Sequence, residues 1–456
     1  MSARESVADP YALLPESIEE PPVTLLAAFR RIGPGVILAS SIVGSGELIA
    51  TTILGAESGY SLLWLILVSC GIKIIIQNEI GRYTIGTGET ILEAFDRVPG
   101  PRWRVSWVVW LWALMLAMIM FSTGGMLGAI GEVFHTLVPA VPINAWVWII
   151  NVATVVLLIM GRYGLIEKLS MLLVGGFTLL TVSCAFLLIK RPEFFSLSAA
   201  LDGLTFSLPA GGFATAVTVF GATGVGAGEL VAYPYWCIEK GYARFAGPQD
   251  GTPAWQRRAR GWIRVMGLDV LNSFVIYTFA TVAFYLLGAG VLHGRGIIPQ
   301  GSEMVGMLSA MYTEILGPSS HTLFLIGAVV VFYSTVFAST ASQARMVADF
   351  LGMLGSYDRR DYQRRIATMR IAVVVLMFLP SLYFTFLQQP VFMVKLGGVA
   401  QALMLPIIGL ATIYLRYRHL PNAVLPKGWI TLGLWISSLI AAVMMAYYVI
   451  HEATGF

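Results

Sequence analysis

Eleven apolar stretches follow one another along the chain, separated by polar connections. Each is about 20 residues long, which at about 1.5 Å per residue allows a helix to cross the hydrocarbon core of a membrane. A segment inside lipid has to satisfy its own backbone hydrogen bonds, so each stretch is expected to be helical. The pattern predicts an all-α polytopic membrane protein with spans near residues 33–55, 60–85, 107–135, 143–160, 165–189, 207–236, 262–291, 318–350, 366–387, 391–415 and 428–450.

The composition agrees with this architecture and narrows the class of function. Hydrophobic residues make up 57% of the 456 residues and charged residues only 12%, against about 25% charged in an ordinary globular protein. These values exclude a disordered chain, a nucleic-acid-binding module and an ordinary water-soluble enzyme. The sequence shows no nucleophile–base pair and no soluble domain, so we expect neither enzyme activity nor a nucleic-acid partner. The three cysteines are too few for a disulfide framework.

The placement of charge predicts the orientation of the chain. Residues 1–32 are polar, lack the apolar core of a signal peptide, and are expected to form a cytosolic tail. With the N-terminus inside, most of the 29 lysines and arginines fall on inner loops, and the outer loops hold only Lys190, Arg191 and Arg295. This asymmetry follows the positive-inside rule and places the C-terminus outside. A bacterial cytoplasmic membrane is the expected location, with the lipid bilayer as the surroundings.

One motif occurs twice, at residues 44–60 and 226–242, and reads Gly-x-Gly-Glu-Leu-(Ile/Val)-Ala followed by Glu-x-Gly-Tyr. The first copy lies in the first span and the second in the sixth, which cross the membrane in opposite directions. The motif therefore predicts a 5+5 inverted repeat, a common plan of secondary transporters. Residues 33–190 would form the first repeat, residues 207–415 the second, and residues 428–456 an eleventh helix with a short outer end.

The glycines of the motif predict that helices 1 and 6 are broken, since each glycine weakens a helix by about 1 kcal/mol. Backbone groups freed at membrane depth persist where they face a cavity or a ligand. A carboxylate follows the glycines in both copies, at an insertion cost of about 2.5–3.5 kcal/mol. Close helix packing by the glycines and capping of the half-helices by the carboxylates are alternative roles. The expected substrate site comprises Gly44, Ser45, Gly46, Glu47, Thr223, Gly226, Gly228 and Glu229.

Further polar residues in the spans are candidates for coupling or gating. Lys73 and Gln77 share one helix face, and a buried lysine needs an acid partner or loses its proton; a structural ion pair and a coupling role both stay open. Glu79 and Arg82 are expected to form an inner gate or a structural pair. Asp269, near the inner end of the seventh span, is expected to be a solvated anchor. The coupling or gating candidates are Lys73, Gln77, Glu79, Arg82 and Gln401.

At several places the sequence resembles the Nramp family of proton-coupled divalent-metal transporters. The likeness is strong in spans 1, 2 and 6 and looser elsewhere up to span 10. It implies a LeuT-type fold of ten helices plus one, with alternating access. The residues that carry it are Gly33-Pro34-Gly35, the run from Gly59 to Trp64, Gln77, Arg82, Thr87-Gly88, Tyr163-Gly164, Gly221-Ala222-Thr223 and Leu405-Pro406.

The departures from the family pattern concern the metal ligands. The family's span 1 reads Asp-Pro-Gly-Asn, and its two ligand positions are Gly44 and Glu47 here. The family's span-6 methionine corresponds to Gly226, or to Val225 if the alignment shifts by one. Losing the thioether and gaining Glu47 and Glu229 predicts an all-oxygen metal site, which suits hard cations such as Mg²⁺ and Mn²⁺. No cofactor is expected apart from such a transported cation.

Two transport hypotheses remain at this stage. The first is a secondary transporter of a hard divalent cation held by Glu47 and Glu229. The second is a LeuT-type transporter of an organic solute, in which the amides of Gly44-Ser45-Gly46 bind a substrate carboxylate and the glutamates bind an amine or a proton. A channel, a membrane enzyme or a receptor fits the broken helices less well. The substrate, the coupling ion, the transport direction and the oligomeric state are left open by the sequence.

Overall fold

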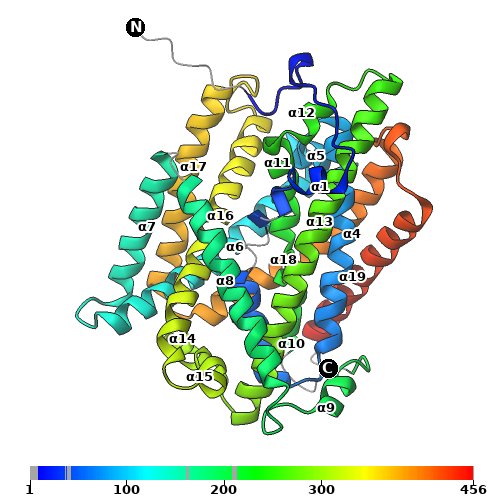
Figure 1. Cartoon of the computed structure of the whole chain (residues 1–456). Coiled ribbons are helices and arrows are strands. Elements are labelled where there is room, and N and C mark those ends of the chain that lie inside the picture. Colours follow the sequence, from blue (N-terminus) through cyan, green and yellow to red (C-terminus); the bar gives the residue numbers. More distant parts are fainter. Residues whose placement is uncertain (1–8, 36, 39–42, 161–163, 208–212, 455–456) are drawn as a thin grey trace.

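The computed structural model describes residues 9–35, 37–38, 43–160, 164–207 and 213–454, and within them the chain is almost entirely helical (Figure 1). Nine helices of this part of the chain are long and apolar enough to cross a membrane. They coincide with nine of the predicted spans. They are α4 (Leu63–Thr87), α6 (Trp107–Leu137), α7 (Ile143–Met160), the unit Phe213–Lys240, the unit Pro253–Arg295, α16 (Ser320–Met353), α17 (Tyr362–Leu387), α18 (Pro390–Arg418) and α19 (Gly428–Thr454).

The two remaining predicted spans are also helical in the described residues but are not among these nine. The fifth is α8 (Gly164–Leu188), and the first contains the π-helical segment η2 (Val43–Thr51) and α3 (Thr52–Ser58). Tyr163 of the family resemblance lies outside the described residues. The division into two five-helix repeats and an eleventh helix stays a prediction.

Short elements connect the long helices. The only strands of the described residues are β1 (Arg102–Trp103) and β2 (Val105–Ser106), an antiparallel pair that the all-α prediction did not include. The short helices are α1 (Leu25–Phe29), α5 (Ile91–Asp96), α9 (Leu197–Asp202), α12 (Tyr242–Ala246), α14 (Met304–Leu308) and α15 (Ala310–Leu316). Shorter turns of helix are η1 (Pro15–Ser17), η3 (Gly288–Leu292), η4 (His293–Arg295), η5 (Gly301–Glu303) and η6 (Asn422–Val424).

The long helices form one bundle with two distinct ends (Figure 1). α1, α5, α11 (Ala227–Lys240) and α12 gather at one end, and α9, α14 and α15 gather at the other. Within the bundle α6 packs against α17 and α18, and α4 packs against α13 (Pro253–Leu287). The described start of the chain and the end of α19 lie at opposite ends, as an odd number of crossings requires.

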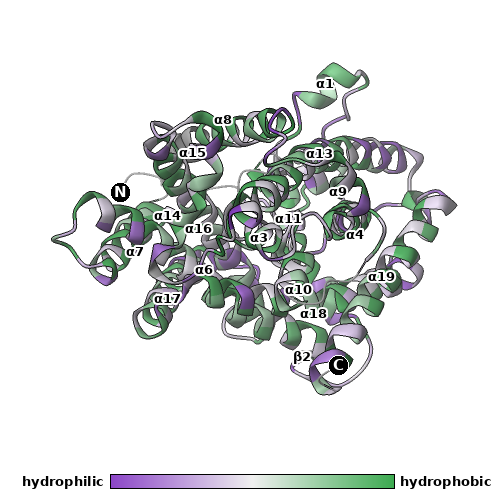
Figure 2. Cartoon of the chain, turned by 90° about the horizontal axis from the view of Figure 1, so that it is seen from below, coloured by the Kyte–Doolittle hydropathy of each residue, from purple (hydrophilic) through white to green (hydrophobic). Residues whose placement is uncertain are grey.

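The outer surface of the bundle is apolar. Hydrophobic residues dominate the long helices seen from one end (Figure 2), and outward side chains such as Val152, Phe386 and Leu439 are 60%, 78% and 63% exposed. A soluble monomer rarely presents so much continuous apolar surface. The buried polar residues, by contrast, collect inside the bundle, where the two breaks lie.

Candidate substrate site between two broken helices

The first break lies at Gly44, where the backbone angles φ −79° and ψ −105° leave the helical region. The segment then continues as the π-helical η2 up to Thr51. A Cβ atom on Gly44 would lie 2.4 Å from Oγ1 of Thr335, so the missing side chain lets α16 approach this break closely. The predicted break of the first span is therefore present.

The second break separates α10 (Phe213–Ala222) from α11, whose N-cap is Gly226. Gly224 has φ +62°, a left-handed backbone conformation that glycine adopts without strain. The turn leaves carbonyl groups at the end of α10 and amide groups at the start of α11 without helical partners. Both helices that the sequence predicted to be broken are broken.

Glu47 joins the two breaks. Its side chain is fully buried, and Oε1 accepts hydrogen bonds from the Gly224 amide at 2.7 Å, the Thr223 hydroxyl at 3.3 Å and the Thr281 hydroxyl at 3.1 Å. The carboxylate of the first span thus satisfies a backbone amide freed in the sixth. Glu47 Oε2 is also buried and has no hydrogen-bond partner among the described residues.

The backbones of the two breaks are in direct contact. A Cβ atom on Gly46 would lie 2.7 Å from the carbonyl oxygen of Ala222. The hydroxyls of Thr51 and Thr223 are 2.7 Å apart, and the Thr51 hydroxyl also donates to the Gly46 carbonyl at 2.8 Å. Glycine at this position of the motif therefore permits the two broken spans to touch, which is the packing role that the sequence left as an alternative.

Lys73 reaches the same break from α4. Its fully buried Nζ donates to the carbonyl oxygen of Thr223 at 2.6 Å and lies 3.5 Å from that of Gly221. No carboxylate of the described residues lies within 4.0 Å of it, so the ammonium is held by backbone oxygens and not by an ion pair. Glu47 and Glu229 act on it electrostatically from farther away.

Glu229 lies in the first turn of α11, and Gln401 of α18 approaches the same turn. The Oε2 atom of Glu229 would be 2.4 Å from a Cβ atom on Gly226, and so would Oε1 of Gln401. The Gly228 amide donates to Gln401 Oε1 at 3.2 Å. Glu229 is partly exposed, whereas Gln401 is buried. The bare backbone at Gly226 thus leaves room for two side-chain oxygens beside the second break.

The other sequence candidates lie around this centre or away from it. Ser45 is half-buried within η2, and Gln77 is buried one turn along α4 from Lys73, with both polar side-chain atoms lacking a hydrogen-bond partner in the described chain. Glu79 pairs with Arg82 at 2.9 Å and with Arg416 of α18 at 3.3 Å. These contacts fit the structural-pair alternative, because they tie α4 to α18.

Sequence reasoning missed three residues beside the second break. Thr281 and Tyr277 are one turn apart on α13; Thr281 bonds Glu47, and the buried Tyr277 ring packs on Gly224 with its hydroxyl unpartnered among the described residues. The Sγ atom of Cys70 would lie 3.1 Å from a Cβ atom on Gly224. Hydroxyls four residues apart in an apolar helix were a usable signal, whereas nothing local marked the cysteine.

The expectation for Asp269 was wrong. Its side chain is fully buried, and its carboxylate accepts from the amides of Gly33 and Gly35 at 3.0 and 2.6 Å and from the Tyr233 hydroxyl at 2.9 Å. The seventh span therefore caps the beginning of the first span. The residue looked solvated because its two backbone partners, Gly33 and Gly35, are more than 200 positions away along the chain.

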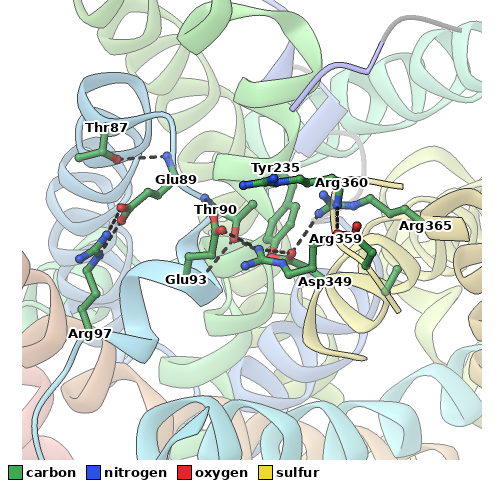
Figure 3. A network of polar contacts seen from close by, with 12 residues as sticks. Thr87, Glu89, Thr90, Glu93, Arg97, Tyr235, Asp349, Arg359, Arg360 and Arg365 are labelled. Atoms are coloured by element: carbon green, nitrogen blue, oxygen red, sulfur yellow. Dashed lines mark hydrogen bonds and ion pairs between the residues drawn. The ribbon is translucent and has the colours of Figure 1, made fainter. Parts of the chain in front are cut away.

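A polar network closes the end of the bundle that holds α5, α11 and α12 (Figure 3). At its centre is Asp349, which is fully buried and accepts from the hydroxyls of Thr90 and Tyr235, both at 2.6 Å. Asp349 also pairs with Arg359 at 2.9 Å and with Arg365 at 3.2 Å. The network therefore ties α5, α11, α16 and α17 together at this end.

Residues 9–23, which we name the N-terminal strap, lie against this network. The Tyr11 hydroxyl donates to Glu239 at 3.3 Å, and the Arg365 guanidinium lies 3.6 Å from the Tyr11 ring centre. Glu239 in turn pairs with Arg345 at 2.6 Å. Burial and the neighbouring Glu239 raise the pKa of Tyr11 well above its usual value. The described part of the predicted tail is thus packed onto the bundle.

Two cavities lie at the opposite end. One of about 1060 Å³ is lined by Glu132, His135 and Glu303, and another of about 550 Å³ by Tyr60 and Phe194 among others. Neither is lined by Glu47 or Glu229. Among the described residues, no group of three or more histidine, cysteine, aspartate or glutamate side chains could hold a metal ion. A cation between the breaks would accordingly need backbone or amide oxygens besides the two carboxylates.

The comparisons with known proteins agree with this geometry. The family model described as natural resistance-associated macrophage protein-like matches residues 35–451. The chain belongs to the Nramp family. The sequence resemblance is thereby confirmed, over a longer stretch than its motifs covered.

Relatives and solved structures extend this result. The chain is similar to the divalent metal cation transporter MntH of Deinococcus radiodurans, with 26% identity over 76% of this chain and 74% of that protein. It is similar in structure to a mutant of the Eremococcus coleocola manganese transporter, with a TM-score of 0.62 at 18% identity over 94% of this chain and 88% of that one. MhsT in complex with L-phenylalanine gives a TM-score of 0.57 at 17% identity, over 94% and 98%. At these identities the structures show the fold, which is LeuT-type as expected.

Proposed function

We propose that the protein is a secondary active transporter of a hard divalent cation, Mg²⁺ or Mn²⁺ in kind, which binds between the two helix breaks and crosses by alternating access. One observation carries the proposal: Glu47 spans from the first break to the second and keeps a buried, unpartnered Oε2 there. A buried carboxylate oxygen without a partner is costly, and a bound cation would satisfy it. The D. radiodurans and E. coleocola relatives are named as metal transporters, which supports the same substrate class.

The donor set favours a hard cation. Glu47, Glu229 and Gln401 offer side-chain oxygens near the breaks, and no methionine occupies either break. Oxygen ligands suit Mg²⁺ and Mn²⁺, whereas thioether and thiolate ligands suit softer metals. Cys70 is the one soft donor beside Gly224 in the described chain, and it faces the glycine from α4. Replacing Cys70 therefore tests directly whether the site prefers hard cations without using a sulfur ligand.

Transport of an organic carboxylate is less well supported. In that alternative the freed amides at a break would bind the substrate carboxylate. At the second break the Gly224 amide is already taken by Glu47 at 2.7 Å, and the Gly228 amide by Gln401 at 3.2 Å, so neither is left for a substrate carboxylate. An anionic substrate would also meet two resident carboxylates. Membership of the Nramp family points the same way.

We further place the end with α5, α11 and α12 in the cytosol, in a bacterial cytoplasmic membrane, with the C-terminus outside. Most lysines and arginines that the positive-inside rule assigns to the inner loops lie on connections at this end. Coupling to a pH or sodium gradient is expected of a secondary transporter. Uptake into vesicles with either gradient imposed would establish it, and uptake that follows neither gradient would contradict secondary transport.

Calorimetry tests the site. The purified chain is titrated with Mg²⁺, Mn²⁺, Ca²⁺ and Cd²⁺, as are Glu47→Ala, Glu229→Ala and the control Glu132→Ala, whose buried carboxylate also has an unpartnered oxygen but lies beside the outer cavity. We expect the binding heat to vanish in the first two variants and to persist in the control. Cys70→Ser should leave Mn²⁺ binding unchanged. Absence of heat with every metal in the unmodified protein would refute the proposal.

A further inference from the structure

The ammonium group of Lys73 sits where the second break exposes carbonyl oxygens. α10 ends at Ala222, and the turn through Gly224 leaves carbonyls at its end, such as that of Gly221, without helical amide partners. Lys73 Nζ lies 2.6 Å from the Thr223 oxygen and 3.5 Å from the Gly221 oxygen. The C-terminal end of a helix carries partial negative charge, so a cation is stabilised there.

The surroundings of this ammonium resemble those of a small monovalent cation. Its contacts are backbone oxygens from one unwound turn, and the face of the Phe220 ring lies 6.0 Å away. No carboxylate of the described residues is within ion-pair distance. Unwound carbonyls at broken helices are also the ligands that transporters offer to Na⁺. A lysine that only formed a structural ion pair would instead contact an acid directly.

The charges of the nearby carboxylates explain why a cation is held at this position. Glu47 and Glu229 are the two carboxylates that act on Lys73, and both lie at the breaks. An empty site with the buried Glu47 carboxylate, the partly exposed Glu229 carboxylate and no cation would carry uncompensated charge, which is costly in a medium of low polarity. A cation fixed to the chain offsets part of that charge, and the site then needs no dissolved partner ion when the cargo leaves.

We infer that Lys73 is a tethered monovalent cation that fills an alkali-type position at the end of α10. The site therefore binds and releases its divalent cargo without a co-bound alkali ion. Lys73 acts as a specificity-determining residue: it removes Na⁺ and K⁺ from the binding reaction. The inference extends the proposed function, on which only its second readout below depends.

The first readout uses an alkali ion alone. Thermal unfolding of the full-length protein, of Lys73→Met and of the control Lys395→Met is measured in sodium, potassium and choline chloride at equal ionic strength. Lys395 is also a lysine within a span. Its Nζ atom lies 3.0 Å from Oε1 of Glu57, and this ion pair is away from the breaks. We expect sodium or potassium to raise the unfolding midpoint of Lys73→Met only, because only that variant has a vacant carbonyl position.

The second readout adds Mn²⁺ and measures its affinity in the same salts. In Lys73→Met the affinity should fall in choline and recover by about tenfold in the alkali salt, within the roughly 5–150-fold range of typical coupling between two ligands. In the unmodified protein it should not depend on the alkali ion. The first readout contains no Mn²⁺, so failure of the proposed function and failure of this inference give different results.

Two outcomes overturn the inference. One is an alkali dependence in the unmodified protein as large as that of the variant, because the position would then be open despite Lys73. The other is a folded Lys73→Met that responds to neither alkali ion. If Lys73→Met does not fold, Lys73→Leu takes its place, since its shorter apolar side chain leaves the Thr223 oxygen open to an alkali ion. A folded Lys73→Leu protein that is insensitive to both ions overturns the inference equally.

Discussion

The two copies of the repeated motif end in the same way but have different surroundings. In the first copy Glu57 pairs with Lys395 of α18 at 3.0 Å, and Gly59 ends α3 with φ +57°. In the second copy Glu239 pairs with Arg345 of α16 at 2.6 Å, and Gly241 ends α11 with φ +101°. Each half-helix thus ends in an ion pair and a glycine of positive φ.

The tyrosines that close the two copies show the difference. Tyr60 donates to the Phe194 carbonyl at 2.8 Å beside a cavity of about 550 Å³ near α9. Tyr242 donates to the Arg31 carbonyl at 3.0 Å and stacks on Trp262, whose indole donates to the Glu19 carbonyl of the N-terminal strap. The motif sets how each half-helix ends, and the residues packed around it decide whether that end of the bundle is sealed. In this structure the α11 end is the more heavily closed one.

The strongest contrast is between the two motif carboxylates. Glu47→Ala removes three hydrogen bonds to a buried carboxylate, each worth about 1.5–3 kcal/mol, so we expect destabilisation on the order of 5 kcal/mol. Glu229→Ala, at a partly exposed carboxylate, should cost under about 1 kcal/mol. Unfolding midpoints of both variants in lipid nanodiscs measure the gap. Equal midpoints would mean that the two copies are equivalent in this state.

The second-largest expected difference is in the stability lost when the ion pair at each end is broken. Arg345→Gln breaks a pair whose arginine side chain is only 7% exposed, at a cost of about 3 kcal/mol. Lys395→Gln breaks a pair that is 29% and 18% exposed and should cost about 0.2–1 kcal/mol. A cysteine placed at the α11 end of the bundle should therefore become accessible to a water-soluble thiol reagent in Arg345→Gln. Greater labelling in Lys395→Gln than in Arg345→Gln would reverse the assignment of the closed end.

The capping glycines offer a smaller contrast. A left-handed residue with a Cβ atom costs roughly 1–2 kcal/mol, so both Gly59→Ala and Gly241→Ala should destabilise. The second should cost more, because its Cβ atom would lie 2.5 Å from the Phe245 ring, whereas that of Gly59 would lie 3.1 Å from the His293 ring. Thermal unfolding of the two variants side by side checks the order, and a larger loss in Gly59→Ala would contradict it.

The smallest expected effect concerns the N-terminal strap. Tyr11→Phe removes the hydrogen bond to Glu239 and should weaken docking by about 0.5–1.5 kcal/mol. The pKa of Tyr11 is raised above 10.0 when it is docked, so the undocked tyrosine ionises first as pH rises. Docking should therefore be fully stable below pH 10 and weaken above it. Hydrogen exchange of residues 9–23 should show this dependence in the natural chain and lose it in Tyr11→Phe; a dependence that survives would assign it to another group.

Much of the architecture could be predicted because its signals are local. The length of the apolar stretches predicted nine spans that are long apolar helices in the described residues, and two further spans that are helical there. The glycine–glutamate pattern located both breaks, since glycine weakens a helix wherever it stands. What could not be predicted were contacts between distant segments: Thr281 with Glu47, Asp269 with the start of the first span, and Tyr11 with Glu239.

The sequence by itself determined that this chain crosses a membrane, that two of its helices are interrupted, and that each interruption carries an acid. Hydropathy and backbone propensity depend on neighbouring residues, so they can be read along the chain. Only the tertiary structure decided that Glu47 caps the opposite break, that Lys73 rests on carbonyl oxygens, and that the strap covers one end. Those roles depend on which groups face each other across the bundle, and packing of residues far apart in the sequence sets that.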